Sequence, residues 1–233
     1  MWLKGIGSSF VSTMARERQC SQHLSVGELQ AITRKTLRHY DENASSYFEG
    51  TKDHDVMQNI NALLAEISGS PPYRILDFGC GPGRDLIQFM ALGHEPVGLD
   101  GSPAFVAMAR QSSGCEVLLQ DFLTLDLPAL HFDGVFANAS LFHVPRQELA
   151  RVLQAIWETL EPDGVLFASN PRGNNQEGWS NKRYGCFHDL EQWHGYVIEA
   201  GFKELQHYYR PPGRPCDQQP WLATVWRKID VDQ

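Results

Sequence analysis

A glycine-rich loop with an acidic residue beside it is the feature of this sequence best suited to chemistry. Residues 75–85 read ILDFGCGPGRD, so Gly79, Gly81 and Gly83 follow directly after an apolar run, and Asp77 stands two residues before the first glycine. Glycines in such a loop allow the backbone to come very close to a ligand. The ligand must also accept a carboxylate at this position.

The loop departs from the fingerprint of dinucleotide-binding proteins. That fingerprint, G-x-G-x-x-G, places a pyrophosphate at a helix N-terminus. Here Arg84 occupies the place of the third glycine, and Asp77 would repel a diphosphate. Two further acids, Asp100 and Asp121, follow the next two apolar runs, which a merely tight turn would not require. We therefore expect a positively charged ligand with an adenosine and no phosphate, and an NAD(P)-dependent oxidoreductase is the least favoured alternative.

These residues require a scaffold that alternates strands with helices. From Tyr73 onward, short apolar segments are separated by helical segments, which predicts a parallel sheet with helices on both faces. The predicted strands are 73–79, 95–99, 115–119, 132–138, 164–169, 203–209 and 220–227, and the predicted helices are 84–92, 102–111, 146–160 and 189–200. Only a Pro-rich loop joins the last two strands, so the end of the sheet is expected to be antiparallel. Ligands of such sheets bind beyond the carboxyl ends of the strands, where the glycine loop and the acids would meet.

Residues 25–70 are predicted to form a helical cap over this edge, ahead of a core domain over residues 71–233. Ser25 and Glu28 have the spacing of a capping box that opens the first helix. A second helix is expected from about 54 to 67, because apolar residues recur there on one helical face. They are Val56, Ile60, Leu63, Leu64 and Ile67.

Composition limits the partners and the compartment. A chain of 233 residues with 42% hydrophobic residues can bury a proper core. A net charge of −8 without a long Lys/Arg run argues against nucleic acid or an anionic membrane as partner and favours a small molecule. Five cysteines without a Cys-x-x-Cys pair fit reduced thiols in the cytoplasm. Residues 1–24 are expected to be a disordered leader, and their basic and hydroxyl side chains leave an organelle presequence as an alternative.

The ordered motifs resemble the class I S-adenosylmethionine-dependent methyltransferases, in their small-molecule branch. Asp77 and the three glycines resemble the first motif of that family, and Asp100 follows Gly79 by 21 positions at the end of VGLD. Four later segments resemble further motifs of the family and occur in the same order. They are QDF at 120–122, FDGVFAN at 132–138, SLFHVP at 140–145 and LEPDGVL at 160–166. The resemblance covers roughly residues 73–227. It implies a Rossmann-like, doubly wound, mostly parallel sheet of seven strands with an antiparallel last strand, and S-adenosyl-L-methionine as cofactor.

The resemblance also implies which residues bind the cofactor. Asp77 would reach its ammonium group, Asp100 would bind the ribose hydroxyls, and Asp121 would bind the adenine amino group. Tyr40 would close over the cofactor as part of a lid, with packing in the core as the alternative. The full implied set is Tyr40, Asp77, Gly79, Gly81, Gly83, Arg84, Asp100, Gly101, Ser102, Gln120, Asp121, Phe122, Asn138 and His143.

Methyl transfer from a sulfonium is an in-line displacement that chiefly requires alignment of the acceptor and exclusion of water. No metal ligands or nucleophilic triad are needed, and the sequence suggests none. His143 and Tyr184 are the predicted catalytic candidates: His143 would act as a base or orient the acceptor, or else bond only locally. A Gly- and Asn-rich loop predicted at 170–185 would help to build the acceptor pocket. The predicted acceptor contacts are Tyr47, Arg172 and Arg183, the two arginines being surface residues in the alternative reading.

A motif of nucleic-acid methyltransferases is absent from this sequence, which argues against nucleic acid as the methyl acceptor. Enzymes that methylate nucleic-acid amines carry Asp/Asn-Pro-Pro-aromatic after the fourth strand, where this chain has NASL at 138–141, and no basic face is evident. A small-molecule methyltransferase is therefore predicted, with a protein methyltransferase or a non-catalytic S-adenosylmethionine-binding protein as alternatives. Arg210 and Arg214, in the loop between the last two strands, would either complete an anion site or belong to a stiff structural loop. The sequence makes no prediction of oligomeric state.

Overall fold

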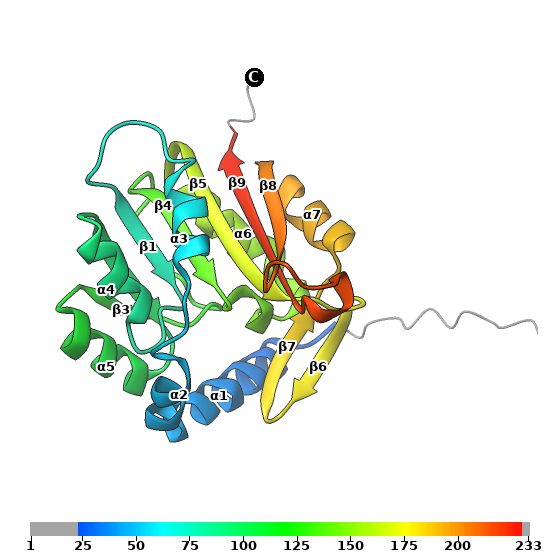
Figure 1. Ribbon diagram of the computed structural model, residues 1–233. Coiled ribbons are helices and arrows are strands. Elements are labelled where there is room, and N and C mark those ends of the chain that lie inside the picture. Colours follow the sequence, from blue (N-terminus) through cyan, green and yellow to red (C-terminus); the bar gives the residue numbers. More distant parts are fainter. Residues whose placement is uncertain (1–22, 230–233) are drawn as a thin grey trace, which may run out of the picture.

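The computed structural model describes residues 23–229, and an open sheet of seven strands lies at its centre (Figure 1). The strand order is β3-β2-β1-β4-β5-β9-β8. The strands are β1 (Arg74–Phe78), β2 (Glu95–Asp100), β3 (Val117–Leu119), β4 (Phe132–Asn138), β5 (Leu160–Pro171), β8 (Phe202–Arg210) and β9 (Trp221–Lys228). The first five pair in parallel, and β9 runs antiparallel to both β5 and β8. The predicted Rossmann-like fold with an antiparallel last strand is confirmed.

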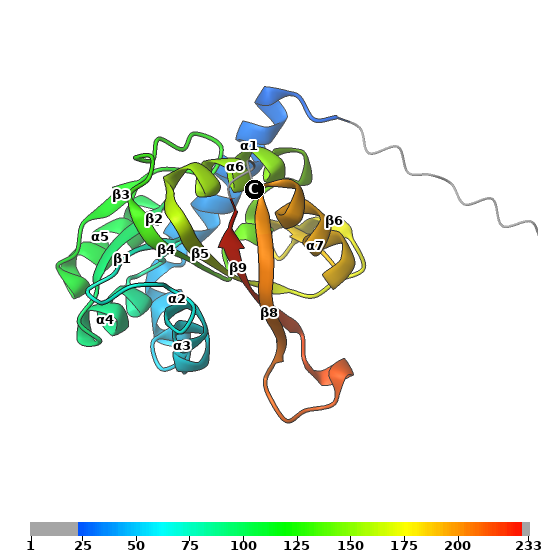
Figure 2. The same ribbon diagram turned by 90° about the horizontal axis from the view of Figure 1, so that it is seen from above.

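Helices pack on both faces of this sheet. One face carries α3 (Met57–Leu64), α4 (Arg84–Ala91) and α5 (Pro103–Ser113), and the other carries α6 (Arg146–Thr159) and α7 (Leu190–Glu199) (Figure 2). Successive strand residues point to opposite faces, so Ile75 and Phe136 pack on the α3 side whereas Leu76 and Val135 pack on the α6 side. Because both faces are buried, the strands read as the continuous apolar runs seen in the sequence.

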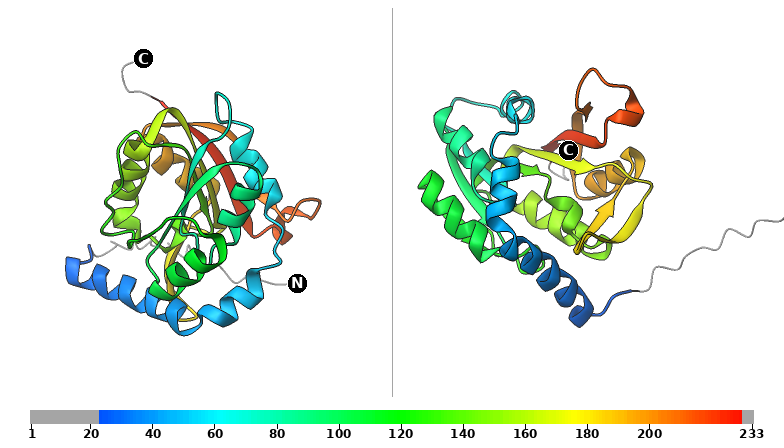
Figure 3. Two further views of the ribbon diagram at one scale, coloured as in Figure 1. Left: turned by 90° about the vertical axis from the view of Figure 1, so that its left-hand side faces the viewer. Right: turned by 60° about the horizontal axis from the view of Figure 1, so that its bottom comes forward.

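The three N-terminal helices lie at two different locations, two at an edge of the sheet and one against its face. α1 (Val26–Glu42) and α2 (Ala44–Thr51) cross the edge of the sheet at the carboxyl ends of the parallel strands (Figures 1 and 3). The predicted capping box is present at Ser25 and Glu28. α3 departs from the predicted cap, because the apolar face that carries Ile60 and Leu63 is fully buried against the sheet. α1 and α2 therefore lie over the edge where ligands are expected, whereas α3 lies chiefly against a face of the sheet.

The segment predicted as a loop at 170–185 instead contains a β-hairpin. Its strands, β6 (Gln176–Ser180) and β7 (Arg183–Phe187), are joined by Asn181 and Lys182, which both have positive φ as a two-residue type I′ turn requires. Trp179 and Tyr184 lie opposite each other on the hairpin, with ring centroids 5.4 Å apart. The main chain of the hairpin contacts α1 through the Tyr184 N–H, which donates to Thr36 Oγ1 at 3.1 Å. The hairpin is therefore fixed beside the ligand edge.

Part of the predicted leader, residues 1–22, lies outside the described residues, as do residues 230–233. Within residues 23–229, no helix is long and apolar enough to cross a membrane. The same part of the chain holds no cluster of three or more His, Cys, Asp or Glu side chains that could bind a metal ion.

Candidate active site

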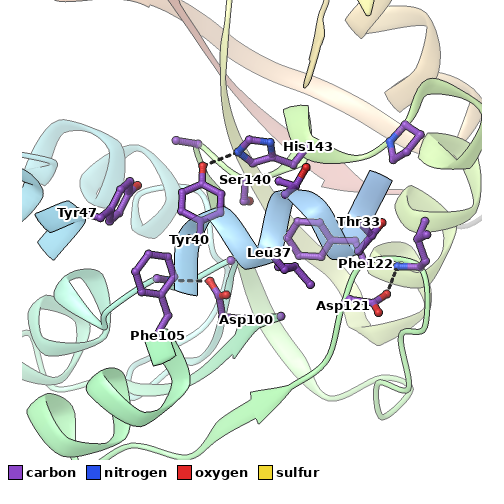
Figure 4. A pocket seen from close by; sticks show the side chains of 17 residues that line it. Thr33, Leu37, Tyr40, Tyr47, Asp100, Phe105, Asp121, Phe122, Ser140 and His143 are labelled. Atoms are coloured by element: carbon purple, nitrogen blue, oxygen red, sulfur yellow. Dashed lines mark hydrogen bonds between the residues drawn. The ribbon is translucent and has the colours of Figure 1, made fainter. Parts of the chain in front are cut away.

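Two hollows meet at the carboxyl edge of the sheet. The inner cavity, of about 80 Å³, lies between α1 and the glycine loop, and the outer cleft, of about 830 Å³, lies beside it toward α2, the hairpin and the end of β8. Tyr40, Tyr47 and Ala139 line both. Figure 4 shows the inner cavity, with side chains from α1 on one side and strand-end residues on the other.

The glycine loop gives the inner cavity its shape. Gly79 and Gly81 line the cavity with φ values of +83° and +54°, a region that residues with a Cβ rarely adopt. A Cβ at Gly79 would lie 2.4 Å from the Cβ of Ser140, so a side chain cannot fit without displacing the start of the next segment. Gly83 has another function: a Cβ there would lie 2.8 Å from the Ala109 Cα, so this glycine permits α4 and α5 to pack closely.

Asp100 is held rigidly at the end of β2. Its Oδ2 accepts a hydrogen bond from the Gly81 N–H at 3.0 Å, and its Oδ1 accepts one from the Ser102 N–H at 2.8 Å. Burial raises the pKa of Asp100 to about 6, although these main-chain donors oppose the rise. The carboxylate faces the inner cavity, where remaining lone pairs could accept hydrogen bonds from ligand hydroxyls.

Asp77 is a buried acid without a complete set of partners. Its side chain is 1% exposed, and its Oδ2 has no hydrogen-bond partner within the described part of the chain. Burial, together with the neighbouring Asp85 and Asp100, raises the pKa of Asp77 well above its usual value. A buried carboxylate oxygen of this kind is costly unless a donor reaches it. An unpaired acceptor of this kind fits a ligand that brings a cationic donor, such as the ammonium of S-adenosylmethionine, although Asp77 itself lines neither hollow.

Asp121 and Phe122 line the far end of the inner cavity. The Asp121 Oδ1 accepts hydrogen bonds from the N–H groups of Leu123 and Thr124, which fixes the carboxyl group. Phe122 stacks on Phe78 of β1, with ring centroids 4.6 Å apart, and presents an aromatic ring beside the acid (Figure 4). An acceptor group next to an apolar ring suits the amino group and face of an adenine.

Arg84 and Asn138, predicted as cofactor contacts, lie in the outer cleft. The Arg84 guanidinium makes two hydrogen bonds to Asp85, of 2.6 and 2.9 Å, and donates to the Thr51 carbonyl of α2. Asn138 donates to Asp85 at 3.3 Å and accepts from Asn59 of α3. These hydrogen bonds therefore connect α2 and α3 to α4, the helix that follows the glycine loop. Asp85 was not among the predicted site residues. Its place in the first turn of α4 was an available signal, because the helix dipole stabilises an acid there.

A chain of hydrogen bonds links His143 to the boundary between the two hollows. His143 Nδ1 lies 2.6 Å from the Tyr184 carbonyl oxygen, which can only accept, so the proton is assigned to Nδ1. Its Nε2 then accepts from the Tyr40 hydroxyl at 2.7 Å, and that hydroxyl accepts from Arg183 Nη1 at 3.2 Å. Burial lowers the pKa of His143 to about 4. The ring is neutral at physiological pH, and neither nitrogen is free to take a proton from an acceptor.

Three further predicted residues lie outside both hollows. Gln120 closes a loop by bonding the N–H and the carbonyl of Asp126. Ser102 caps α5 and donates to the Asp41 carboxylate. Arg172 donates to the carbonyls of Cys216 and Gln219 and so holds the loop before β9. Their side chains are satisfied by the protein itself.

Tyr184 was predicted as a catalytic side chain, and the structure places only its main chain near the site. Residues alternate in direction along a strand. On β7, Arg183 therefore faces the outer cleft while the Tyr184 side chain packs edge-on against Trp179. The Tyr184 carbonyl, and not its hydroxyl, contributes to the site by fixing His143.

Several lining residues were missed by the sequence analysis. They are Thr33, Thr36 and Leu37 of α1, Phe105 of α5 and Ser140 after β4. The α1 residues recur at a spacing of three to four, which marks one helical face, but nothing in their types indicates a ligand. Ser140 lies inside the SLFHVP motif, where its position directly after a strand was an available signal.

The fold and the site define a nucleotide-fold protein whose acidic strand ends suit a cationic adenosyl ligand, and comparisons with known proteins agree. The family described as "Methyltransferase domain" matches residues 75–164. The trans-aconitate 2-methyltransferase of Escherichia coli is 34% identical over 179 residues, which cover 73% of this chain and 67% of that protein. The chain therefore belongs to the class I S-adenosylmethionine-dependent methyltransferases. Matches among the first curated relatives cover between 42% and 76% of their own length.

Solved structures extend the likeness to the fold of nearly the whole chain. The 1,6-didemethyltoxoflavin-N1-methyltransferase of Burkholderia thailandensis superposes with a TM-score of 0.73 at 20% identity and covers 89% of this chain and 93% of that one. The [4+2]-cyclase SpnF superposes with a TM-score of 0.65 at 18% identity, over 84% of this chain and 96% of that one. Since a cyclase shares the fold, the fold by itself does not define the reaction.

Proposed function

We propose that this protein transfers the methyl group of S-adenosylmethionine to a small molecule bound in the outer cleft. The observation that carries the proposal is the meeting of the two hollows at Tyr40 and Tyr47, with Asp100 and Asp121 lining the inner side. A donor in the inner cavity and an acceptor in the outer cleft would face each other across these two rings. The name of the Escherichia coli relative, which specifies trans-aconitate, supports an acceptor of small size.

The donor would be held by groups that the structure already orients. The main chain at Gly79 and Gly81 would approach the methionine part, Asp77 would receive its ammonium, and Asp100 would bind the ribose. The proposed contacts also include Tyr40, Gly101, Asp121 and Phe122. When bound, S-adenosylmethionine supplies an electrophilic methyl group on a sulfonium. The protein supplies alignment, which can contribute about 7–11 kcal/mol to such a reaction.

Ligand binding and methyl transfer test the proposal separately. S-adenosylmethionine and S-adenosylhomocysteine should raise the melting temperature, whereas NADH should not, and Asp100→Ala should remove most of the increase. Incubation with methyl-labelled S-adenosylmethionine and a fractionated metabolite extract should then label a compound below about 1 kDa. Label confined to proteins would favour a protein methyltransferase, and binding without any label would favour a non-catalytic binding protein.

We further propose a cytoplasmic location. Cys80, Cys115, Cys186 and Cys216 are all free thiols in residues 23–229, which suits a reducing compartment. The net charge of −8 supports the proposal that nucleic acid is not a partner. Fractionation of cells that express the full chain would test the location, and recovery with organelles would favour the presequence alternative.

A further inference from the structure

We propose that the acceptor is a small molecule with at least two carboxylate groups, one held by Arg183 and the other by Arg210. The inference rests on the proposed methyl transfer and concerns the chemistry of the outer cleft. Both arginines line that cleft. Neither has an ion-pair partner within the part of the chain that the structure describes, and both are half-buried.

Arg183 lies where the two hollows join. It is the first residue of β7, its Nη1 donates to the Tyr40 hydroxyl, and its guanidinium carbon is 5.7 Å from the centre of the Tyr40 ring. One bond to a neutral hydroxyl leaves most of the five guanidinium donors for other partners. A carboxylate paired with Arg183 would therefore lie beside Tyr40, at the boundary with the inner cavity.

Arg210 brings the second charge from a different wall of the cleft. It ends β8, and its Nη2 donates only to the main-chain carbonyl of Asp55, at 3.1 Å. Arg84 also lines the cleft, but Asp85 neutralises it. Arg183 and Arg210 are thus the two arginines of the cleft that a ligand can neutralise.

Acidic and titratable side chains also line the outer cleft. Asp53, His54 and Asp55 come from the segment between α2 and α3 and are all exposed. The Asp55 Oδ1 already accepts the Met57 N–H. Exposed carboxylates are screened by water and salt, whereas half-buried guanidinium groups are less so. The half-buried Arg183 and Arg210 therefore favour an anion in the outer cleft, and the exposed Asp53 and Asp55 do not cancel that preference.

The chemistry of the boundary points to the same acceptor. His143 is neutral and both its nitrogens are engaged, so no described group beside Tyr40 is placed to deprotonate an alcohol or an amine. A carboxylate is ionised at neutral pH without a base. One of its oxygens forms a bond to the methyl carbon while the sulfur–carbon bond breaks and its electron pair goes to sulfur. The products are a methyl ester and a neutral thioether, and no proton is released.

Two arginine variants with matched controls test the inference. Arg183→Gln and Arg210→Gln remove the proposed anchors, while Lys182→Gln and Arg214→Gln change neighbouring exposed cations that line neither hollow. Binding of mono-, di- and tricarboxylates of three to six carbons is measured by calorimetry on the S-adenosylhomocysteine complex. Labelled methyl groups in the products are tested for release as methanol by alkali, which cleaves esters.

We expect at least one dicarboxylate or tricarboxylate to bind and to become alkali-labile product. Arg183→Gln and Arg210→Gln should each weaken its binding by about 10- to 100-fold, as loss of a charge-assisted pair does, and the control variants should not. Binding of S-adenosylhomocysteine should persist in all four variants. Alkali-stable methylation of a neutral compound or an amine, or equal binding of acids by all variants, would overturn the inference while leaving methyl transfer intact. Absence of methyl transfer to any compound would instead overturn the proposed function.

Discussion

Asp100 offers a test of the electrostatics of the inner cavity that does not require a substrate. Burial raises its pKa from 3.8 to about 6, so the folded protein holds the proton of Asp100 more tightly than the unfolded chain does. Folding stability contributed by this group is therefore present below about pH 4 and is lost as the pH rises through 6. The difference between the two pKa values corresponds to a loss of about 3 kcal/mol in the free energy of unfolding. Of this loss, about 2 kcal/mol occurs between pH 4.5 and 7.

Asp100→Asn removes this pH dependence. The substitution also exchanges one acceptor oxygen for a donor opposite the N–H of Gly81 or Ser102, which costs stability at every pH. The level of stability is therefore a poor test, and its slope with pH is a good one. Urea denaturation of the cofactor-free protein at steps between pH 4.5 and 7 should show the wild type losing about 2 kcal/mol relative to the variant.

Parallel curves for the two proteins would refute the reasoning, because they would mean that Asp100 has an ordinary pKa in the folded state. The affinity for S-adenosylhomocysteine gives a second measurement of the same group. If ribose hydroxyls donate to the ionised carboxylate, wild-type affinity should fall as the pH drops from 7 to 5, and the affinity of Asp100→Asn should change less. Both measurements depend on one titration, so both pH dependences should level off above about pH 6.

Three further substitutions address other parts of the site. Gly79→Ala should destabilise the protein by about 3 kcal/mol in urea denaturation, since its Cβ meets Ser140 at a positive φ; a loss below about 0.5 kcal/mol would contradict the geometry. Asp77→Asn should raise the melting temperature of the cofactor-free protein at pH 7, because folding no longer has to bury a carboxyl group that is ionised in the unfolded chain. The same substitution should weaken S-adenosylmethionine binding. Tyr40→Phe should reduce turnover by about tenfold or more, because His143 and Arg183 each lose the hydrogen bond to the Tyr40 hydroxyl. The affinity for the methyl donor should change by less than about threefold. Unchanged turnover would show that the hydroxyl is dispensable.

The sheet was predictable from the sequence because its signals are local. Most strands are short apolar runs, and several helices begin or end at a residue whose chemistry suits that position, such as Ser102 before Pro103 and Gly114 at the end of α5. The glycine loop was equally local, since its three positive φ angles need glycine whatever surrounds them. The doubly wound sheet of seven strands with an antiparallel last strand then followed from the resemblance to a family.

The direction of individual side chains was much less predictable. Arg183 and Tyr184 are neighbours in sequence, and only the pairing of β7 with β6 decides that the first faces the cleft and the second faces Trp179. Gln120 could have faced a ligand but bonds to Asp126 instead. The two-residue turn at Asn181 and Lys182 was also missed, because Gly and Asn favour loops and hairpins alike. These choices depend on which strand or loop residue each side chain pairs with, and the residue types alone do not decide that.

The separation of charge between the two hollows gives the proposals a common physical basis. Asp100 and Asp121 line the inner side, where a sulfonium donor would bind. Arg183 and Arg210, which have no ion-pair partner within residues 23–229, line the outer side, where a carboxylate acceptor would bind. The rings of Tyr40, Tyr47 and Phe105, with centroids 5.2–5.5 Å apart, pack together at the boundary and give it an aromatic surface. Transfer of the methyl group removes the positive charge of the sulfonium and the negative charge of the reacting carboxylate, so removing water from the boundary disfavours the charged reacting groups more than the transition state. An uncharged acceptor would gain less from such a boundary, because its reaction would leave a positive charge or a proton that no described group beside Tyr40 is placed to receive.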